Sequence, residues 1–576
     1  MRLVAALLVL ACFASAESKD PKDSKAPEDP NAQDRKKAEK LLKDAETQKG
    51  FLTLHRKEGK VYAELAEADF GRSFLCFESI SRGVGRGWVL GGMTLDDLIL
   101  SFRRISKKTV QVLRQNPRFR ADKGSPMERA VSHSFGPSVL ASLPVAARHP
   151  DRKTVIVDLG PLFLTDMPDV ATPLKEAFEQ AYKLDAGRSS WGEAKVFPKN
   201  VELEVFLSFS ASELKDLETV PDSRHVEVGV HYSLYRLPEN GYRPRLADDR
   251  VGHFLTAVRD FSRPGLSSFV RYVTRWHLQK ADPAAAVSPP KDPLVFWIEN
   301  TVPHRYRRVV RDGILEWNRA FARIGISDAI EVRQMEEDAD WDPEDARYNC
   351  FRWITSSRLS FGAIGPSRVD PRTGQILDAD ILYEAENLRG LLWSYQRHHL
   401  PRSDAGAPEP YFLAHEAPRP VILRGACDLA VLRVPDLDFA RTAFWLRRPG
   451  RPVPEEYIVQ GLKETVTHEV GHVLGLRHNF KASMIVDLDE LDDRERAERE
   501  GLFGSVMEYN PPNVARDPER QGYYFTPTLG AYDHWAIEYG YTFEDDRRQA
   551  LVKEVAQPGK QYATDEDTWG PDPYVA

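Results

Sequence analysis

HEVGHVLGLRHNF, residues 468–480, places three histidines, one glutamate and two glycines in a chain of 576 residues that has 15 histidines in all. The residues from Glu455 to Leu474 combine good helix formers with an apolar face, which predicts a helix. On a helix, His468 and His472 project from the same side, one turn apart. Two imidazoles at this spacing fit zinc, which binds histidine nitrogen at about 2.0–2.1 Å.

Gly475 follows three residues after His472. A helix that continued would turn His478 away from the other two histidines. Glycine adopts the left-handed conformation that ends helices, so the chain can turn back and present His478 to the same metal. Three histidines leave the fourth tetrahedral position open, as in catalytic zinc sites. Glu469 lies on a neighbouring flank of the helix, which suits a base that is not itself a ligand.

A methionine turn follows in Gly504-Ser-Val-Met-Glu-Tyr-Asn. HExxHxxGxxH followed by such a turn is the arrangement of the metzincin zinc endopeptidases. The stretches HEVGHVLGLRHNFKAS, SVMEYNPPN and GAYDHWAIEYGY resemble a family of large exported bacterial metzincin-type zinc metalloproteases. FPKNVELEV, RPRLADDRVGHF, RYNCFRWI and DPRTGQILDADILY resemble the flanking regions of the same family, so the resemblance covers roughly residues 50–575.

This resemblance implies an α+β protein. Its zincin-like (metzincin) catalytic domain would have a mixed sheet and an active-site helix, preceded by β-rich N-terminal domains. It also implies one Zn²⁺ cofactor held by His468, His472 and His478. Met507 would lie beneath the metal, and Tyr509 matches the position where some metzincins carry a tyrosine that approaches the metal or the oxyanion.

The residue pattern supports this organisation independently. Short alternating or apolar runs fill the N-terminal half and predict strands. The clearest runs begin at Phe51, Lys60, Ser73, Thr109, Thr154, Val201 and His225. Prolines cluster in residues 281–296 and mark a boundary, beyond which strand, helix and strand patterns indicate an α/β unit.

The chain is therefore expected to have six regions. These are a signal peptide (1–16), a disordered charged linker (17–45) that merges into a short helix near its end, a small β-rich domain (46–115), a β-rich α+β domain (116–285), a metzincin zinc peptidase domain (290–545) and a C-terminal tail (546–576).

The first sixteen residues, MRLVAALLVLACFASA, are typical of a secretory signal peptide, with Arg2 before an apolar run and a small-x-small cleavage signature at the end. They predict an exported protein, in the periplasm, at the cell surface or secreted. Val9 to Cys12 loosely resembles a bacterial lipobox, which leaves a lipid anchor at Cys12 open as an alternative. No later apolar run approaches the length of about 18 residues that a transmembrane span requires.

Composition and charge exclude other classes of function. The net charge is −8 and no long basic tract is present, so we expect no nucleic-acid partner. Cys76, Cys350 and Cys427 form at most one disulfide, which indicates a fold that depends on its packed core. His225 and His231 are expected on the surface of a strand and not in a second metal site.

The predicted function is that of an exported zinc-dependent endopeptidase, in which Glu469 is the general base for a zinc-activated water and Tyr509 assists the oxyanion. The substrate is an extended polypeptide that pairs with an edge strand, for which Gln375 to Tyr383 is the best candidate. Two alternatives stay open: a catalytically inactive zinc-binding adhesion or scaffold protein, and a zinc hydrolase of a non-peptide amide. The presence of Glu469 argues against the first, because a merely structural site needs no base.

Overall fold

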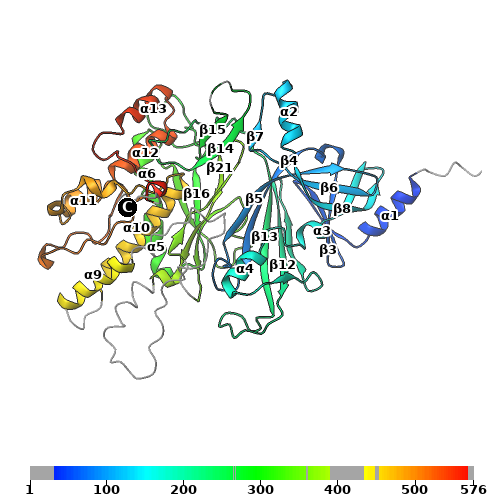
Figure 1. Cartoon of the computed structure of the whole chain (residues 1–576), viewed down its shortest axis with the longest axis horizontal. Coiled ribbons are helices and arrows are strands. Elements are labelled where there is room, and N and C mark those ends of the chain that lie inside the picture. Colours follow the sequence, from blue (N-terminus) through cyan, green and yellow to red (C-terminus); the bar gives the residue numbers. More distant parts are fainter. Residues whose placement is uncertain are drawn as a thin grey trace, which may run out of the picture.

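The computed structural model describes residues 31–263, 265, 267–357, 361–388, 434–447 and 453–568. The predicted signal peptide, Cys12 and the first part of the charged linker lie outside these residues. Within them, strands dominate the N-terminal half and helices gather in the C-terminal part (Figure 1). The predicted mixed α and β fold with a β-rich N-terminal region is confirmed.

Twelve of the described strands form one sheet, in the order β1-β2-β3-β9-β8-β6-β5-β4-β13-β12-β10, with β11 also paired to β12. All its neighbouring strands are antiparallel. Their bounds are β1 (Glu46–Lys49), β2 (Thr53–Lys57), β3 (Lys60–Leu65), β4 (Ser73–Arg82), β5 (Thr94–Arg104), β6 (Thr109–Arg114), β8 (Ser138–His149), β9 (Thr154–Asp158), β10 (Lys183–Leu184), β11 (Ser190–Val196), β12 (Asn200–Ser210) and β13 (His225–Arg236).

Strand β12 shows why these residues form a sheet. Side chains alternate between the two faces of a strand, so residues two apart share a face. Along one face of β12 every side chain is apolar and fully buried: Val201, Leu203, Val205, Leu207 and Phe209. The same core takes in helices α3 (Gly160–Phe163) and α4 (Ala171–Phe178).

Helix α1 (Ala32–Leu42) forms the end of the stretch that the sequence predicts to be a disordered linker up to residue 45. Its Ala38 is buried against Ala147 and Ile156 of the large sheet. This contact gives the otherwise charged segment an apolar surface to pack on, which is why a helix is stable there. Helix α2 (Pro126–Ser134) lies between β7 (Phe119–Arg120) and β8 in the chain.

His231 differs from the expectation that it lies on the surface. It is buried, and its Nε2 lies 3.4 Å from the Glu202 carboxylate on the neighbouring strand. This face of the sheet is covered by a segment of the C-terminal half, since the Asn200 amide donates a hydrogen bond of 3.0 Å to Asp345. His225, in contrast, is exposed as predicted.

A five-stranded sheet supports the C-terminal half, in the order β17-β16-β18-β22-β19. The bounds are β16 (Leu294–Ile298), β17 (Ile330–Gln334), β18 (Asn349–Ile354), β19 (Ala363–Ile364) and β22 (Ile381–Glu384). Four strands are parallel, and β19 is antiparallel to β22 at the edge.

This order corrects the predicted edge strand at Gln375 to Tyr383. That stretch forms β21 (Ile376–Ala379), which pairs with β20 (Ser367–Val369), and most of β22. Strand β22 is interior, because it lies between β18 and β19. The described edge next to it is β19. A separate three-stranded sheet has the order β15-β14-β7. Its bounds are β7 (Phe119–Arg120), β14 (Leu255–Asp260) and β15 (Phe269–Val273).

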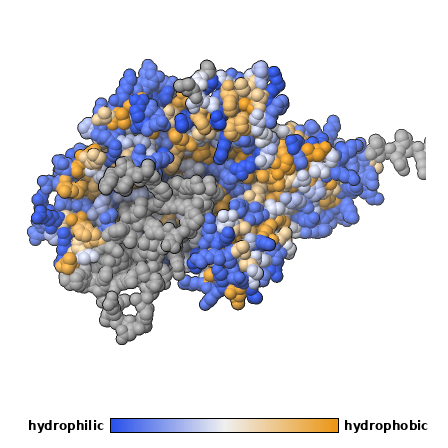
Figure 2. All heavy atoms as spheres, viewed as in Figure 1, coloured by the Kyte–Doolittle hydropathy of each residue, from blue (hydrophilic) through white to orange (hydrophobic). Residues whose placement is uncertain are grey.

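Helices cover the five-stranded sheet, with α10 (Glu455–Val473) packed along α5 (His304–Leu315) (Figure 1). Further helices with described bounds are α6 (Asn318–Arg323), α9 (Val434–Arg447), α11 (Arg494–Glu500), α12 (Ala531–Tyr541), α13 (Asp545–Leu551) and α14 (Asp565–Thr568). Short 3₁₀ turns lie at Glu67–Asp69, Ala482–Ile485, Leu488–Glu490, Pro518–Arg520 and Val552–Glu554. Within the described residues, no helix is long and apolar enough to cross a membrane. On the face shown in Figure 2, hydrophobic residues lie in small groups among hydrophilic ones.

Candidate metal centre

Helix α10 carries the first part of the site. It begins after Pro454, and Glu455 and Glu456 in its first turn interact favourably with the positive end of the helix dipole. Its apolar face is completely buried in the C-terminal core through Leu462, Val466, Val470 and Val473. A helix fixed along its length in this way holds the histidines near its C-terminal end in constant positions.

The helix ends at Val473, and a Schellman motif follows with Gly475 as its left-handed residue. Gly475 donates its N–H to the His472 carbonyl, and Leu476 donates to the Gly471 carbonyl, both at 2.9 Å. The φ of Gly475 is +98°, in the region that favours glycine, and a Cβ on it would lie 2.1 Å from the Thr274 carbonyl oxygen. Both conformation and space therefore require glycine, and the chain reverses here as predicted.

The reversal brings His468, His472 and His478 together. One ring nitrogen of each lies within 4.8 Å of those of the other two, and all three side chains are buried. Among the described residues this is the cluster of histidine, cysteine and acidic side chains with the spacing of a metal site.

The second ring nitrogen of each histidine faces an oxygen. The distances are 2.6 Å from His468 Nδ1 to the Val506 carbonyl and 2.9 Å from His472 Nδ1 to the Leu476 carbonyl. His478 Nδ1 lies 2.8 Å from Asp565 Oδ1. Carbonyl oxygens only accept hydrogen bonds, so the proton of the first two rings is on Nδ1, and the Nε2 lone pairs point into the cluster.

These lone pairs are what a metal ion needs. His472 Nε2 and His478 Nε2 are 3.1 Å apart. Two zinc ligands at 2.0–2.1 Å and tetrahedral angles would be about 3.3 Å apart, so the pair is nearly preformed for zinc. Burial, together with the nearby His478, lowers the pKa of His472 to about 3, which keeps this imidazole neutral and able to bind a cation. The residues present therefore fit Zn²⁺.

Glu469 is the next residue after His468 on α10 and is fully buried. Its backbone carbonyl faces Gly365, where a Cβ would lie only 2.6 Å from that oxygen. Gly365 directly follows the edge strand β19, so this strand passes close to the helix that carries the histidines.

The methionine turn lies beneath the cluster. Met507 is fully buried, and its carbonyl accepts a 3.0 Å hydrogen bond from the Asn479 N–H. Asp533 of α12 holds the turn, because its carboxylate accepts hydrogen bonds from the Ser505 hydroxyl and the Val506 N–H. The Val506 carbonyl in turn orients His468, so the turn acts on the site through its backbone.

Tyr509 comes from the same turn and reaches the histidine cluster. Its hydroxyl lies 3.0 Å from His478 Nε2, and the two rings meet edge to face with centroids 4.6 Å apart. The structure therefore brings all five residues of the predicted site into one place. Their individual roles stay predictions.

Two segments distant in sequence hold the loop that carries His478 in place through backbone hydrogen bonds. On one side, the Phe254 N–H donates to the Gly475 carbonyl at 2.8 Å and the Arg477 N–H donates to the Gly252 carbonyl at 3.0 Å. On the other, the Phe480 N–H donates to the Ala563 carbonyl at 2.8 Å. Sequence reasoning missed both segments, and it missed Asp565. Among the stretches that resemble the metzincin-type family, RPRLADDRVGHF was the only signal, since it ends at Phe254.

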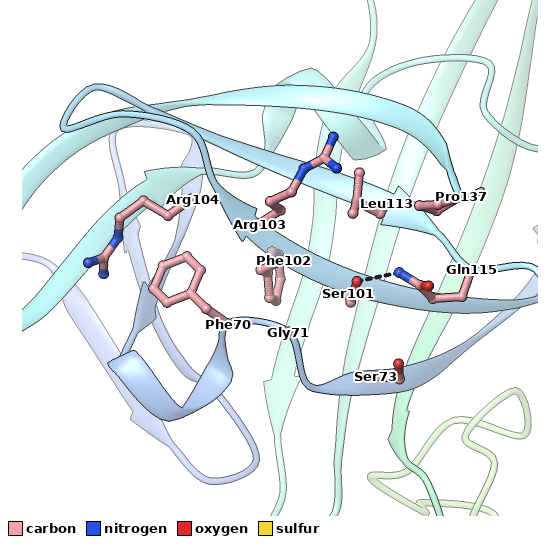
Figure 3. Close-up of a pocket in the computed structure, with 10 residues that line it drawn as sticks. All are labelled: Phe70, Gly71, Ser73, Ser101, Phe102, Arg103, Arg104, Leu113, Gln115 and Pro137. Atoms are coloured by element: carbon pink, nitrogen blue, oxygen red, sulfur yellow. Dashed lines mark hydrogen bonds between the residues drawn. The ribbon is translucent and has the colours of Figure 1, made fainter. Parts of the chain in front are cut away.

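A separate depression of about 460 Å³ lies in the large N-terminal sheet (Figure 3). Its lining residues are Phe70, Gly71, Ser73, Ser101, Phe102, Arg103, Arg104, Leu113, Gln115 and Pro137. The Gln115 amide spans part of it with a 2.7 Å hydrogen bond to the Ser101 hydroxyl. None of these residues belongs to the histidine cluster.

Three family models match the chain. Residues 450–576 match a family described as Met-zincin. Residues 92–281 match a domain of unknown function, DUF5117, and residues 35–83 match a second one, DUF5118. No curated protein and no solved structure matches. The match at 450–576 contains all three histidines and the methionine turn.

Proposed function

We propose, from the premise that residues 450–576 form a domain of the metzincin-type zinc metalloproteases, that this protein is a zinc-dependent endopeptidase. The observation that carries the proposal is the convergence of three histidine Nε2 atoms whose Nδ1 atoms all face oxygens. A buried carboxylate, Glu469, follows the first of these histidines.

His468, His472 and His478 would hold the metal through Nε2. Zinc, when bound, supplies a Lewis acid that polarises the scissile carbonyl and makes water acidic enough to attack near neutral pH. A carboxylate oxygen of Glu469 takes the proton from the attacking water and passes it to the nitrogen of the leaving amine. The Tyr509 hydroxyl donates a hydrogen bond to the oxyanion that forms as the carbonyl carbon becomes tetrahedral.

The substrate would be an extended polypeptide, bound as an added strand. We assign this role to the edge strand β19, in place of Gln375 to Tyr383. Strand β19 is antiparallel to its neighbour β22, and Gly365 at its end packs on the backbone of Glu469. A peptide aligned on this strand would run past the general base.

Export is a further part of the proposal. It rests on the signal-like residues 1–16, and a lipid anchor at Cys12 is the alternative to free secretion. Fractionation of cells that make the full chain would locate the protein. Incorporation of a radiolabelled fatty acid, lost in Cys12→Ser, would show the anchor.

The test of function is hydrolysis of casein and of a peptide library by the purified zinc-loaded chain. We expect cleavage that a chelator abolishes and zinc restores. Glu469→Ala should keep the zinc and the fold but lose activity by orders of magnitude. Glu455→Ala, at the exposed start of the same helix, is the matched control and should cleave like the parent.

A Glu469→Ala variant as active as the parent would contradict the assigned mechanism. A zinc-loaded parent that cleaves no peptide would contradict the endopeptidase itself. Hydrolysis of a non-peptide amide by the same protein would then indicate a zinc hydrolase that acts on non-peptide amides. No hydrolysis of either substrate would indicate a zinc-binding scaffold protein.

A further inference from the structure

The three histidines of the cluster are not oriented in the same way. His468 and His472 face backbone carbonyls of the methionine turn and of the helix end. His478 faces a side-chain carboxylate, with its Nδ1 2.8 Å from Asp565 Oδ1. Asp565 is 87 residues further along the chain, at the start of helix α14.

The Asp565 carboxylate is itself held in place. Its Oδ2 accepts a 3.2 Å hydrogen bond from the Thr564 hydroxyl and lies 3.5 Å from the guanidinium of Arg477. Arg477 also contacts the Glu566 carboxylate. With Oδ2 engaged on one side, Oδ1 is directed at the His478 ring on the other.

The backbone around Asp565 is anchored to the loop that carries His478. The Asn479 amide donates to the Gln561 carbonyl at 3.0 Å, and its Oδ1 accepts from the Ala563 N–H at 3.3 Å. The ring of Tyr562 stacks on Tyr532 of helix α12, with centroids 5.9 Å apart. Asp565 is therefore presented by a segment fixed to the core as well as to the loop.

A carboxylate at this position also improves the charge balance of the site. Three neutral imidazoles do not compensate the two positive charges of a zinc ion, and all three side chains are buried. Burying a charge is costly unless opposite charges are near. Asp565 supplies a negative charge next to the cluster, because its Oδ1 lies 2.8 Å from His478 Nδ1. A histidine that donates to a carboxylate is also a more basic ligand than one that donates to a carbonyl.

We propose that Asp565 is a positioning residue of the zinc site, which keeps the proton of His478 on Nδ1 and directs its Nε2 at the metal. This inference rests on the proposed three-histidine site but not on any substrate. It extends the functional site to a segment that lies beyond the histidine motif and the methionine turn.

The test is the zinc affinity of the full chain, measured on metal-free protein by competition with a chromophoric chelator. Asp565→Ala should bind zinc about 10- to 100-fold more weakly than the parent. Asp565→Asn keeps an oxygen acceptor but loses the charge, so its affinity should fall by a smaller factor. Glu566→Ala is the matched control, since Glu566 contacts Arg477 but not His478, and it should bind like the parent.

Thermal unfolding of the metal-free variants separates positioning from packing, because a positioning residue changes affinity while the melting temperature stays close to that of the parent. Affinity in Asp565→Ala within twofold of the parent would overturn the proposal, and so would an equal loss in Glu566→Ala. If Asp565→Ala does not fold, Asp565→Asn decides, and parent-like affinity there overturns the proposal. Because zinc binding is measured separately from cleavage, failure of the proposed function is recognised independently.

Discussion

The backbone of Gly471 lies directly against the thioether of Met507: a Cβ on residue 471 would be 2.2 Å from the Met507 sulfur. The same Cβ would lie 2.9 Å from the Trp317 ring. Helix α10 therefore rests on the methionine turn with no room for a side chain between them. Gly471 lies between His468 and His472, so its close contact with Met507 fixes the distance of both histidines from the methionine turn.

Gly471→Ala should consequently destabilise the protein and weaken zinc binding. Overpacking a core costs about 1–3 kcal/mol, of which alanine's better helix propensity recovers about 1 kcal/mol. Thermal melting and chelator competition would measure the two effects. Gly461→Ala is the control on the same helix, because its Cβ would meet only the edge of the Phe525 ring, at 3.1 Å. Equal behaviour of the two variants would show that contact with the turn is unimportant.

Tyr509→Phe should lower kcat with little change in KM. The Tyr509 hydroxyl is 3.0 Å from His478 Nε2, within reach of an oxyanion formed at the site. Loss of one such hydrogen bond, made only in the transition state, costs about 10- to 1000-fold in kcat. Steady-state kinetics at a temperature where the variant is folded would measure it. An unchanged kcat would mean that the phenol only packs in the turn.

Gly475→Ala should lower the stability and the zinc affinity of the protein far more than a glycine-to-alanine change at an unobstructed position. Two costs combine at this position, a positive φ and a Cβ 2.1 Å from the Thr274 carbonyl oxygen. Gly241→Ala isolates the first cost, since φ there is +76° and nothing lies within 4 Å of the added Cβ. We expect about 1 kcal/mol for Gly241→Ala and a loss of tight zinc binding in Gly475→Ala alone. Similar melting temperatures and zinc affinities in the two variants would exclude the steric contribution.

His253 should make the free energy of unfolding depend on pH. Burial lowers its pKa to about 4, so the unfolded chain binds a proton more readily than the folded one. The stabilisation by neutral His253 is complete above the unfolded pKa of about 6.5 and is lost as pH falls towards 4. Between about pH 7 and pH 5 the loss is roughly 2 kcal/mol. Urea unfolding of the metal-free chain should show this difference, and His253→Gln should reduce it. An unchanged pH dependence in the variant would show that His253 does not carry the effect.

The sequence predicted those features that depend on near neighbours in the chain. The spacing of His468 and His472 on a helix and the turn at Gly475 follow from backbone geometry alone, and both are present. The apolar run that begins at Val201 likewise identified strand β12. Which strand stands beside which is set by distant pairing, so an apolar run such as β22 did not show that it is interior.

The remaining differences between the sequence predictions and the structure also arise from contacts between segments that are distant in the chain. Strand β19 is only two residues long and has no pattern to recognise. His231 looks like any polar residue of a strand until a segment more than a hundred residues away covers it. Asp565 lies in an acidic, hydrophilic stretch typical of a tail, and only its contact with His478 distinguishes it from Glu566 and Asp567.

The loop that carries His478 is held between Gly252–Phe254 and the segment that ends at Asp565. During translation the first of these partners is made long before the loop, and the second only after a further 87 residues. A nascent chain that has just exposed the histidine motif thus still lacks the carboxylate that orients its third histidine. The order of synthesis therefore places the completion of the site after residue 565, and a chain truncated before residue 561 would lack the carboxylate that orients His478.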